Sequence, residues 1–264
     1  MGGLDAATLE QLQRQFLLWV LIFVRTLAVL TTAPLFSHPG IPVILKASIA
    51  ALIAIALAST QPPATMLELH PLALIPLLLK EVMLGLLLGF LSSAVVYAAR
   101  FAGGLLDMDI GFQTALFFDP ALGGFPTLVG EFYAFAALVL FFWLDGHHAL
   151  LLSLAETLRI APVTELTLRL PSAQVLIGWM AQLTALALNI AAPAMAALFL
   201  TLWALALLAR SAPQINIFLL SFSAKVVVGI GVLALSTPLI VVLLRQALVQ
   251  LQSDLLTLVR ALQP

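Results

Sequence analysis

Charged side chains in apolar surroundings are the first candidates for chemistry in this sequence. They are Arg25, Lys46, Lys80, Glu81 and Arg100, and each lies in or beside a run of Leu, Ala, Val and Ile. An arginine at the centre of a membrane helix costs about 2.5–3.5 kcal/mol on insertion scales, so its side chain usually faces protein or water. Two interpretations stay open: ion pairing and snorkelling within a helix bundle, or the lining of a pathway or an inter-subunit contact.

Other reactive chemistry has little support. His147 and His148 are adjacent, and neighbouring residues on a helix point about 100° apart, which makes them a poor chelate. The chain contains no cysteine and no third ligand at a metal-binding spacing, so we predict no metal site. No Ser/His/Asp arrangement or Gly-rich phosphate loop stands out, so neither an enzyme nor a cofactor is expected. The net charge of −1 and the lack of a basic run argue against nucleic acid as a partner.

Composition places the chain in or against an apolar environment. Hydrophobic residues make up 63% of the 264 residues and charged residues only 9%, whereas soluble domains carry about 25% charged residues. A water-soluble fold of this length could not hide so much apolar surface, so lipid or apolar protein must cover much of it. No pattern of alternating polarity recurs. The predicted class is all-α, of integral membrane type, with helical hairpins and long tilted or kinked helices.

Apolar runs separated by polar breaks define the expected helices. The runs are 16–36, 41–59, 72–106, 127–144, 172–210 and one that begins near Lys225. The first run is roughly 31 Å long at 1.5 Å per residue, enough to cross a bilayer. The tight SHPG break after it predicts a helical hairpin with the second run. Asp5 and Glu10 stand where a signal peptide would be positively charged, so we expect the first helix to be retained.

Two of the runs are longer than the roughly 20 residues of a single span. Run 72–106 is either one long tilted helix or a helix broken near Pro76 or near the glycine pair 103–104. Pro193 predicts a kink inside run 172–210. Residues 149–171 form a shorter amphipathic piece, which we expect at an interface or packed on other helices.

A stripe of small and polar residues follows one face of run 72–106. Glu81, Gly85, Gly89, Ser93 and Tyr97 lie four residues apart, which places them on one slowly winding line of a helix. Gly85 and Gly89 form a small-xxx-small pair that lets another helix approach closely. The stripe is therefore predicted to be a packing face, either within the chain or against another subunit.

Residues 107–126, DMDIGFQTALFFDPALGGFP, interrupt the apolar pattern. Their glycines and prolines predict non-helical backbone, because glycine adopts angles that other residues avoid and the residue before proline avoids the α region. Asp107 and Asp109 are expected in water, at an interface or paired, and the phenylalanines offer apolar surface that needs cover. Non-helical backbone at membrane depth is tolerated only inside protein or along a cavity. A re-entrant or pore-occluding segment and an interfacial connector both remain open.

Several segments resemble a known family. FAGGLLDMDIGFQTALFFDP and the following GEFYAFAALVLFFWLDGHHALLLSLAETLRIAPV are similar to the flagellar export-gate family FliR. The related T subunits of the injectisome export apparatus belong to the same type III secretion family. RTLAVLTTAPLFSHPGIPVILK, KEVMLGLLLGF and LLARSAPQINIF extend the resemblance over essentially the whole chain.

The resemblance implies one export-gate domain over residues 1–264. A FliP-like front part would cover about 1–171 and contain a plug loop at 106–125, and a FliQ-like helical hairpin would cover about 172–264. The implied function is a subunit of the type III protein export gate, which forms with FliP- and FliQ-like subunits a channel for unfolded flagellar proteins. FlhB-like and FlhA-like export proteins and membrane lipid are further expected partners. The expected location is the bacterial inner membrane, in the flagellar basal body.

The expected functional residues form two groups. The pore plug comprises Gly111, Phe112, Leu116, Phe117, Phe118, Asp119, Pro120, Gly123 and Gly124. Helix packing or inter-subunit contact is assigned to Arg25, Glu81, Gly85, Gly89, Arg100, Pro213, Gln214 and Asn216. The equivalent subunit of a virulence injectisome is one alternative function. A stand-alone ion-coupled membrane transporter, with Arg25, Glu81 and Arg100 in an ion path, is the other.

Overall fold

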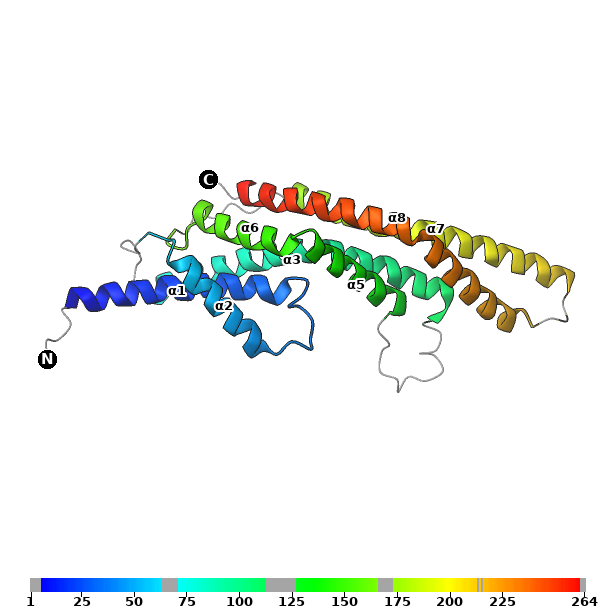
Figure 1. Cartoon of the computed structure of the whole chain (residues 1–264), viewed down its shortest axis with the longest axis horizontal. Helices are drawn as coiled ribbons and strands as arrows, with labels where there is room; N and C mark the ends of the chain where they lie inside the picture. The colour runs from blue at the N-terminus through cyan, green and yellow to red at the C-terminus, as the bar shows by residue number, and fades with distance from the viewer. Residues whose placement is uncertain are drawn as a thin grey trace. The chain divides into compact units, whose positions relative to one another are not determined.

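Helices joined by turns make up the described structure of the chain. The computed structural model describes residues 6–62, 71–112, 127–165, 173–212, 214 and 216–261, and within these ranges no strand is formed (Figure 1). The helices are α1 (Ala6–Thr32), α2 (Val43–Ala58), α3 (Pro71–Ile110), α5 (Leu128–Trp143), α6 (Gly146–Ile160), α7 (Ala173–Ser211) and α8 (Ile217–Ala261). The predicted all-α class is therefore confirmed.

The long run 72–106 folds as one uninterrupted helix. α3 continues through Pro76 and through both glycines at 103–104, and it ends only at Ile110. The helix thus takes in residues 107–110, so the prediction of non-helical backbone from Asp107 onward is wrong. The physical reason is that the Asp107 carboxylate finds hydrogen-bond donors inside the protein, as described below, and has no need to leave the helix.

Two helices begin earlier than the apolar pattern predicts. α8 begins at Ile217 rather than near Lys225. Ser221 and Ser223 interrupt the apolar run there, but each hydroxyl donates to a carbonyl oxygen of the preceding helical turn, at 2.8 and 3.4 Å. Serines that bond in this way remain compatible with a helix. α6 begins at Gly146, inside the DGHH segment, rather than after it.

Most of the described helices are long and apolar enough to cross a membrane. Four qualify singly by length and composition: they lie within α1, α3, α7 and α8. α5 and α6 together would make a fifth span, bent by 68° at their junction. The membrane-type helices expected from the composition are therefore present.

The chain divides into two compact units, each discontinuous in sequence. The first unit comprises Met1–Ser93, Asp145–Ala173 and Leu251–Pro264. In it, α1 and α2 pack on each other as a helical hairpin, as the short break between them predicts (Figure 1). Buried apolar side chains of α1, α2, α3 and α6 form its core, with one from the residues after α6: Leu18, Leu21, Ile22, Ala54, Leu77, Leu158 and Val163.

The second unit comprises Ala94–Leu144 and Gln174–Gln250. It contains the C-terminal part of α3, all of α5, nearly all of α7 and most of α8. The most deeply buried apolar residues of its helices include Ala99, Ala102, Leu106, Ile110, Ala137, Ala187 and Leu244. α8 comes close to α3 within this unit, because a Cβ added at Gly229 would lie 2.8 Å from Ile110 Cγ1.

α7 and α8 leave much apolar surface uncovered by the chain itself. Only 28% of the most apolar stretch of α7 and 17% of that of α8 is buried, against 67% for α3. Exposed large apolar side chains on these two helices include Phe199, Trp203, Phe218, Val227 and Leu235. Apolar exposure on this scale indicates contact with lipid or with another protein.

Candidate functional site

A buried ion pair joins two helices of the first unit. Arg25 on α1 and Glu81 on α3 are 1% and 0% exposed. The guanidinium donates from Nε to Glu81 Oε2 and from Nη2 to Glu81 Oε1, the latter at 3.0 Å. Its other contacts reach α6 and the residue after it: Nη1 donates to Thr157 Oγ1 at 3.2 Å and Nη2 to the Ala161 carbonyl oxygen at 2.8 Å. One side chain therefore fastens α1 to both α3 and α6.

Lys80 brings a second cation to the same cluster. Its Nζ lies 3.1 Å from Glu81 Oε1 and donates to the carbonyl oxygens of Pro162 at 2.6 Å and Glu165 at 2.5 Å. Every member of this charged cluster, which we define as Arg25, Lys80 and Glu81, thus has partners inside the protein. A bidentate Arg–carboxylate pair is both strong and geometrically specific, and the cluster acts as an internal fastening of the first unit.

The glycine stripe of α3 lies against α1 of the same chain. A Cβ added at Gly85 or Gly89 would overlap backbone or side-chain atoms of α1. Further along the stripe, the Ser93 hydroxyl donates to the Thr32 carbonyl oxygen. The structure therefore brings these stripe residues into one intra-chain helix contact, whereas Tyr97, the last in the series, is 40% exposed.

The structure describes the two ends of the predicted plug. Gly111 has a φ of 98°, a conformation that strongly favours glycine, and it ends α3. Phe112 follows and is half-buried. On the other side, Thr127 is the N-cap residue of α5, and its side chain makes no capping hydrogen bond. The remaining predicted plug residues lie outside the described residues: Leu116, Phe117, Phe118, Asp119, Pro120, Gly123 and Gly124.

Asp107 supplies the cap that Thr127 does not. Its side chain lies on α3 and is fully buried. Both carboxylate oxygens accept from the Val129 N–H at 3.1 Å, and Oδ2 also accepts from the Gly130 N–H at 3.2 Å. Both donors belong to the first turn of α5, where N–H groups lack partners within the helix. The positive end of the helix dipole also favours a carboxylate at this place.

Two further contacts join α3 and α5 beside Asp107. A Cβ added at Gly103 would overlap the backbone of Gly130, so the two helices touch through their main chains. Arg100 Nη2 lies 3.0 Å from Glu131 Oε2, and both side chains are partly exposed. Arg100, Gly103 and Asp107 follow one another at i, i+3 and i+7, on one face of α3. We call this face, packed on residues 129–131, the α3–α5 clamp.

An apolar cavity of about 390 Å³ lies beside the clamp in the second unit. Its lining consists of Phe112, Leu128, Val129, Phe132, Tyr133, Ile230, Leu233, Ala234 and Thr237. A cavity with so little polar lining suits an apolar side chain or chain segment rather than a charged ligand. Asp109 faces a smaller cavity of about 90 Å³ that Lys225 also lines.

The turn between α7 and α8 contains the predicted contact residues of the SAPQIN segment. Asn216 Oδ1 accepts a hydrogen bond from the Leu219 N–H at 3.3 Å, which caps the start of α8. Gln214 is exposed in this turn, and Pro213 lies outside the described residues. Asn216 therefore has a capping role within the chain, in addition to the helix-packing or inter-subunit contact predicted for it.

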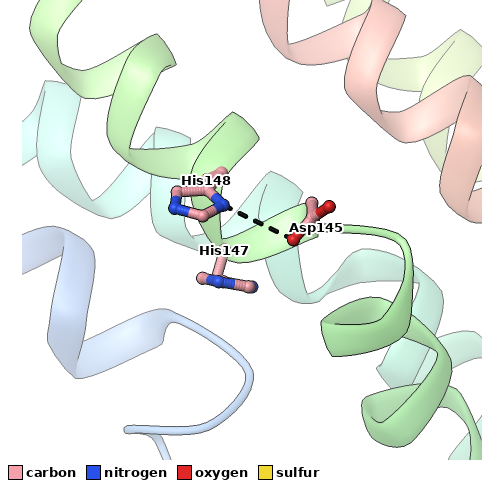
Figure 2. A group of neighbouring side chains, drawn as sticks. All are labelled: Asp145, His147 and His148. Atoms are coloured by element: carbon pink, nitrogen blue, oxygen red, sulfur yellow. Dashed lines mark ion pairs between the residues drawn. The ribbon is translucent and has the colours of Figure 1, made fainter.

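Asp145, His147 and His148 form the group of described side chains that could share a metal ion (Figure 2). One ligand atom of each lies within 4.8 Å of the others, and His148 Nδ1 is 3.4 Å from Asp145 Oδ1. Asp145 is the third member of the group, which the two adjacent histidines did not indicate in the sequence. A structural zinc site takes four ligands, and the adjacent start of α6 carries a positive dipole end that disfavours a cation. We interpret the group as polar residues at the N-terminus of α6.

These features define a helical protein of membrane type, fastened internally by buried charge and by direct main-chain contact between helices. The comparisons with known proteins agree with that class. The family described as "Bacterial export proteins, family 1" matches residues 16–251, and the chain belongs to this family. The resemblance noted in the sequence is therefore confirmed.

Individual relatives of the chain carry flagellar and injectisome names. The "Flagellar biosynthetic protein FliR" of Bacillus subtilis is 28% identical over 232 residues, or 86% of this chain and 88% of the relative. The protein of the same name from Pectobacterium carotovorum is 31% identical over 218 residues, or 83% of each chain. The "Yop proteins translocation protein T" of Yersinia pestis is 26% identical over 219 residues, or 82% of this chain and 84% of the relative.

Proposed function

We propose that the chain is the FliR-type subunit of the flagellar type III protein export gate. The observation that carries this proposal is the family match over residues 16–251. Among the relatives described above, the flagellar proteins are 28% and 31% identical, and the injectisome protein is 26% identical. These values favour the flagellar system, and the equivalent injectisome subunit is the second candidate.

In the proposed gate, FliP- and FliQ-like subunits cover the apolar surface that α7 and α8 leave exposed. These two helices belong to residues 172–264, the part that we propose to be a FliQ-like hairpin, with residues 1–171 as the FliP-like part. Their low burial within the chain supports this assignment. A subunit that keeps such surface free of its own chain needs either lipid or neighbouring proteins around it. We place the assembly in the bacterial inner membrane, at the flagellar basal body, where FlhB-like and FlhA-like proteins would adjoin it.

The segment between α3 and α5 is the proposed plug of the closed channel. Its described ends support this role, since Gly111 turns the chain out of α3 and Phe112 starts its apolar part. The channel would pass unfolded flagellar proteins, and the plug would seal it between substrates. The relatives carry flagellar biosynthetic and translocation names, and on that basis we assign the chain a structural and gating role rather than a catalytic one.

Purification tests the proposed assembly. The tagged chain, expressed with the FliP- and FliQ-like proteins of its own organism, should bring both of them along in a stable complex. It should be poorly stable in detergent when expressed alone. A chain that purifies alone as a stable, folded protein, and does not retain these partners, would instead favour the stand-alone transporter.

Two functional assays complete the test. Loss of the gene should abolish export of flagellar hook protein and motility, and secretion of injectisome effectors should persist. Deletion of residues 110–122 should leave the complex assembled but leaky to small ions in membrane vesicles. A deleted complex as tight as the parent would refute the plug role. Loss of effector secretion with normal motility would assign the chain to an injectisome.

A further inference from the structure

Lys46 is a buried lysine for which the described residues supply no partner. It is 9% exposed and lies on the face of α2 that also buries Ala50 and Ala54. The ion pairs among the described residues involve other cations, and no described oxygen accepts a hydrogen bond from Lys46 Nζ. Lys80, which is also buried, has a carboxylate and two carbonyl oxygens around its Nζ. An ammonium group without a partner is unfavourable away from water, so Lys46 needs a counter-charge beyond the described residues.

The nitrogen of Lys46 is open to a ligand although the stem of the side chain is buried. Its Nζ is not enclosed, in contrast to the indole nitrogen of Trp19. Lys46 is the fourth residue of α2, which begins at Val43. A helical side chain lies back over the turn that precedes it. The ammonium group of Lys46 therefore lies toward the N-terminal turn of α2.

That first turn is itself electropositive. The N–H groups at the start of a helix lack partners within it, and the helix dipole adds partial positive charge there. The N-cap residue Pro42 makes no side-chain hydrogen bond, and the first turn contains no acidic residue. The N–H groups of Leu45 and Lys46 donate to the Pro42 carbonyl oxygen at 3.0 and 3.3 Å, but those of Val43 and Ile44 donate to no described acceptor. A lysine at this end of a helix is unfavourable by itself and becomes favourable when an anion lies beside it.

The surroundings of this first turn suit an anion that carries acyl chains. Lys46 is the only charged residue in the sequence of α2, which is otherwise apolar apart from Ser48. Val43, Ile44 and Leu52 are 73%, 78% and 69% exposed. N–H groups at a helix N-terminus bind phosphate, and exposed apolar side chains of this size indicate contact with lipid or protein. A phospholipid satisfies both requirements with one molecule.

We propose that the N-terminal turn of α2 binds the phosphate of an anionic phospholipid. Lys46 supplies the cation, and the N–H groups of Val43 and Ile44 supply two hydrogen-bond donors. We call this place the α2 phosphate site. It would hold the first turn of α2 at the headgroup level of the bilayer, where lysines interact with anionic lipids. The inference goes beyond the proposed export function and does not depend on it.

Native mass spectrometry of the complex purified with its partner subunits tests the site. The complex is first delipidated and then titrated with phosphatidylglycerol, which has a net negative charge, or with phosphatidylcholine, whose phosphate is offset by its own cation. Lys46→Met keeps the stem but removes the ammonium group, and Lys46→Arg keeps a cation. Lys225→Met is the matched control, because it removes a half-buried lysine from α8. Inorganic phosphate is added as a competitor in a separate titration.

We expect phosphatidylglycerol to bind Lys46→Met about tenfold more weakly than the parent, because hydrogen bonds to a charged group are lost. Lys46→Arg and the Lys225→Met control should bind it as the parent does. Phosphatidylcholine should bind the parent more weakly, with little change in Lys46→Met. Inorganic phosphate should compete poorly, since it has no acyl chains to cover apolar surface. The delipidated Lys46→Met complex should retain its partner subunits and melt no earlier than the parent, because an unpaired charge has been removed.

Four results would overturn the inference. Equal affinity of phosphatidylglycerol for the parent and Lys46→Met would mean that the ammonium group lies in water only. An equal loss of affinity in Lys225→Met would indicate a general effect of charge rather than a site. Loss of partner subunits or an earlier melt in delipidated Lys46→Met would mean that Lys46 pairs with a protein carboxylate. Complete displacement of the lipid by inorganic phosphate would make a free anion the ligand. Recovery of the partner subunits by the parent, which tests the proposed function, is scored separately.

Discussion

The charged cluster of Arg25, Lys80 and Glu81 allows a prediction in which the sign of each effect is set by burial. Glu81 is the carboxylate of this cluster. It accepts hydrogen bonds from the Arg25 guanidinium and lies beside the Lys80 ammonium group. Its replacement by leucine leaves the buried cations Arg25 and Lys80 without the carboxylate that both of them contact. Truncation of one partner of a buried ion pair costs about 3–5 kcal/mol. The total stability of a folded domain is only about 5–15 kcal/mol, so Glu81→Leu should strongly reduce the amount of folded complex.

The double variant Arg25→Met/Glu81→Leu separates the cost of leaving one charge unpaired from the free energy that the ion pair itself contributes. Arg25→Met removes the guanidinium but leaves Glu81 beside Lys80, so its effect should be smaller than that of Glu81→Leu. In the double variant, Lys80 keeps its bonds to the carbonyl oxygens of Pro162 and Glu165. Replacing a buried ion pair by apolar side chains of similar volume is often neutral or stabilising. The double variant should therefore be more stable than Glu81→Leu alone.

The assay is unfolding of the purified complex by heat or by increasing denaturing detergent, followed through loss of helical circular dichroism. A double-mutant cycle then gives the coupling between Arg25 and Glu81, which for residues in contact is about 0.5–3 kcal/mol. Strictly additive single effects would refute the geometry, since they would mean that the two side chains do not meet. A Glu81→Leu complex as stable as the parent would refute the argument that Glu81 is the carboxylate that stabilises the two buried cations.

Three further predictions concern single positions. Gly103→Ala should destabilise the complex by about 1–3 kcal/mol in a thermal melt, because the added Cβ would overlap Gly130. Gly178→Ala is the matched control, since nothing lies within 4 Å of its added Cβ. This control should stabilise α7 slightly in the same melt. Gly111→Ala should cost about 1–2 kcal/mol in the same melt, because its φ of 98° disfavours any residue with a Cβ; an unchanged melting temperature would argue against this backbone conformation. Leu235→Asp should reduce recovery of the partner subunits, because this 83% exposed side chain of α8 needs apolar cover; unchanged recovery would place it outside the interface and outside lipid.

The sequence predicted the positions of most helices, but it did not predict which side chains on different helices contact one another, and the reason is physical. Helical runs are local patterns, so the composition and breaks of the chain are enough to locate most of them. The cost of a buried charge says that Arg25 must have a partner, but it does not say which one. Glu81 lies 56 residues away along the chain, and no spacing rule links them. The two open interpretations of Arg25 could be distinguished only when both side chains were placed in space.

The misassignment of Asp107 has the same origin. Seen in sequence, an aspartate after a long apolar run indicates the end of the helix. In the structure its carboxylate accepts from Val129, 22 residues later, and α3 continues past it. The signal that could have indicated this contact was the glycine at position 130 together with the pair at 103–104, which permit close approach of two backbones. Glycine pairs of this kind are too common in membrane-type helices to identify one contact.

The partners of Arg25 also determine when, during synthesis of the chain, α1 can reach its final position. Its guanidinium sits in α1, which leaves the ribosome before α3 and α6: Glu81 is made 56 residues later, and Thr157 and Ala161 come 132 and 136 residues later. During that interval the charge has to be held by water, by lipid headgroups or by the insertion machinery. α1 therefore cannot reach its final position early and independently. Its placement has to wait until α3 and α6 have emerged, so in a nascent chain that stalls before Ala161 the Arg25 side chain of α1 lacks part of its partners.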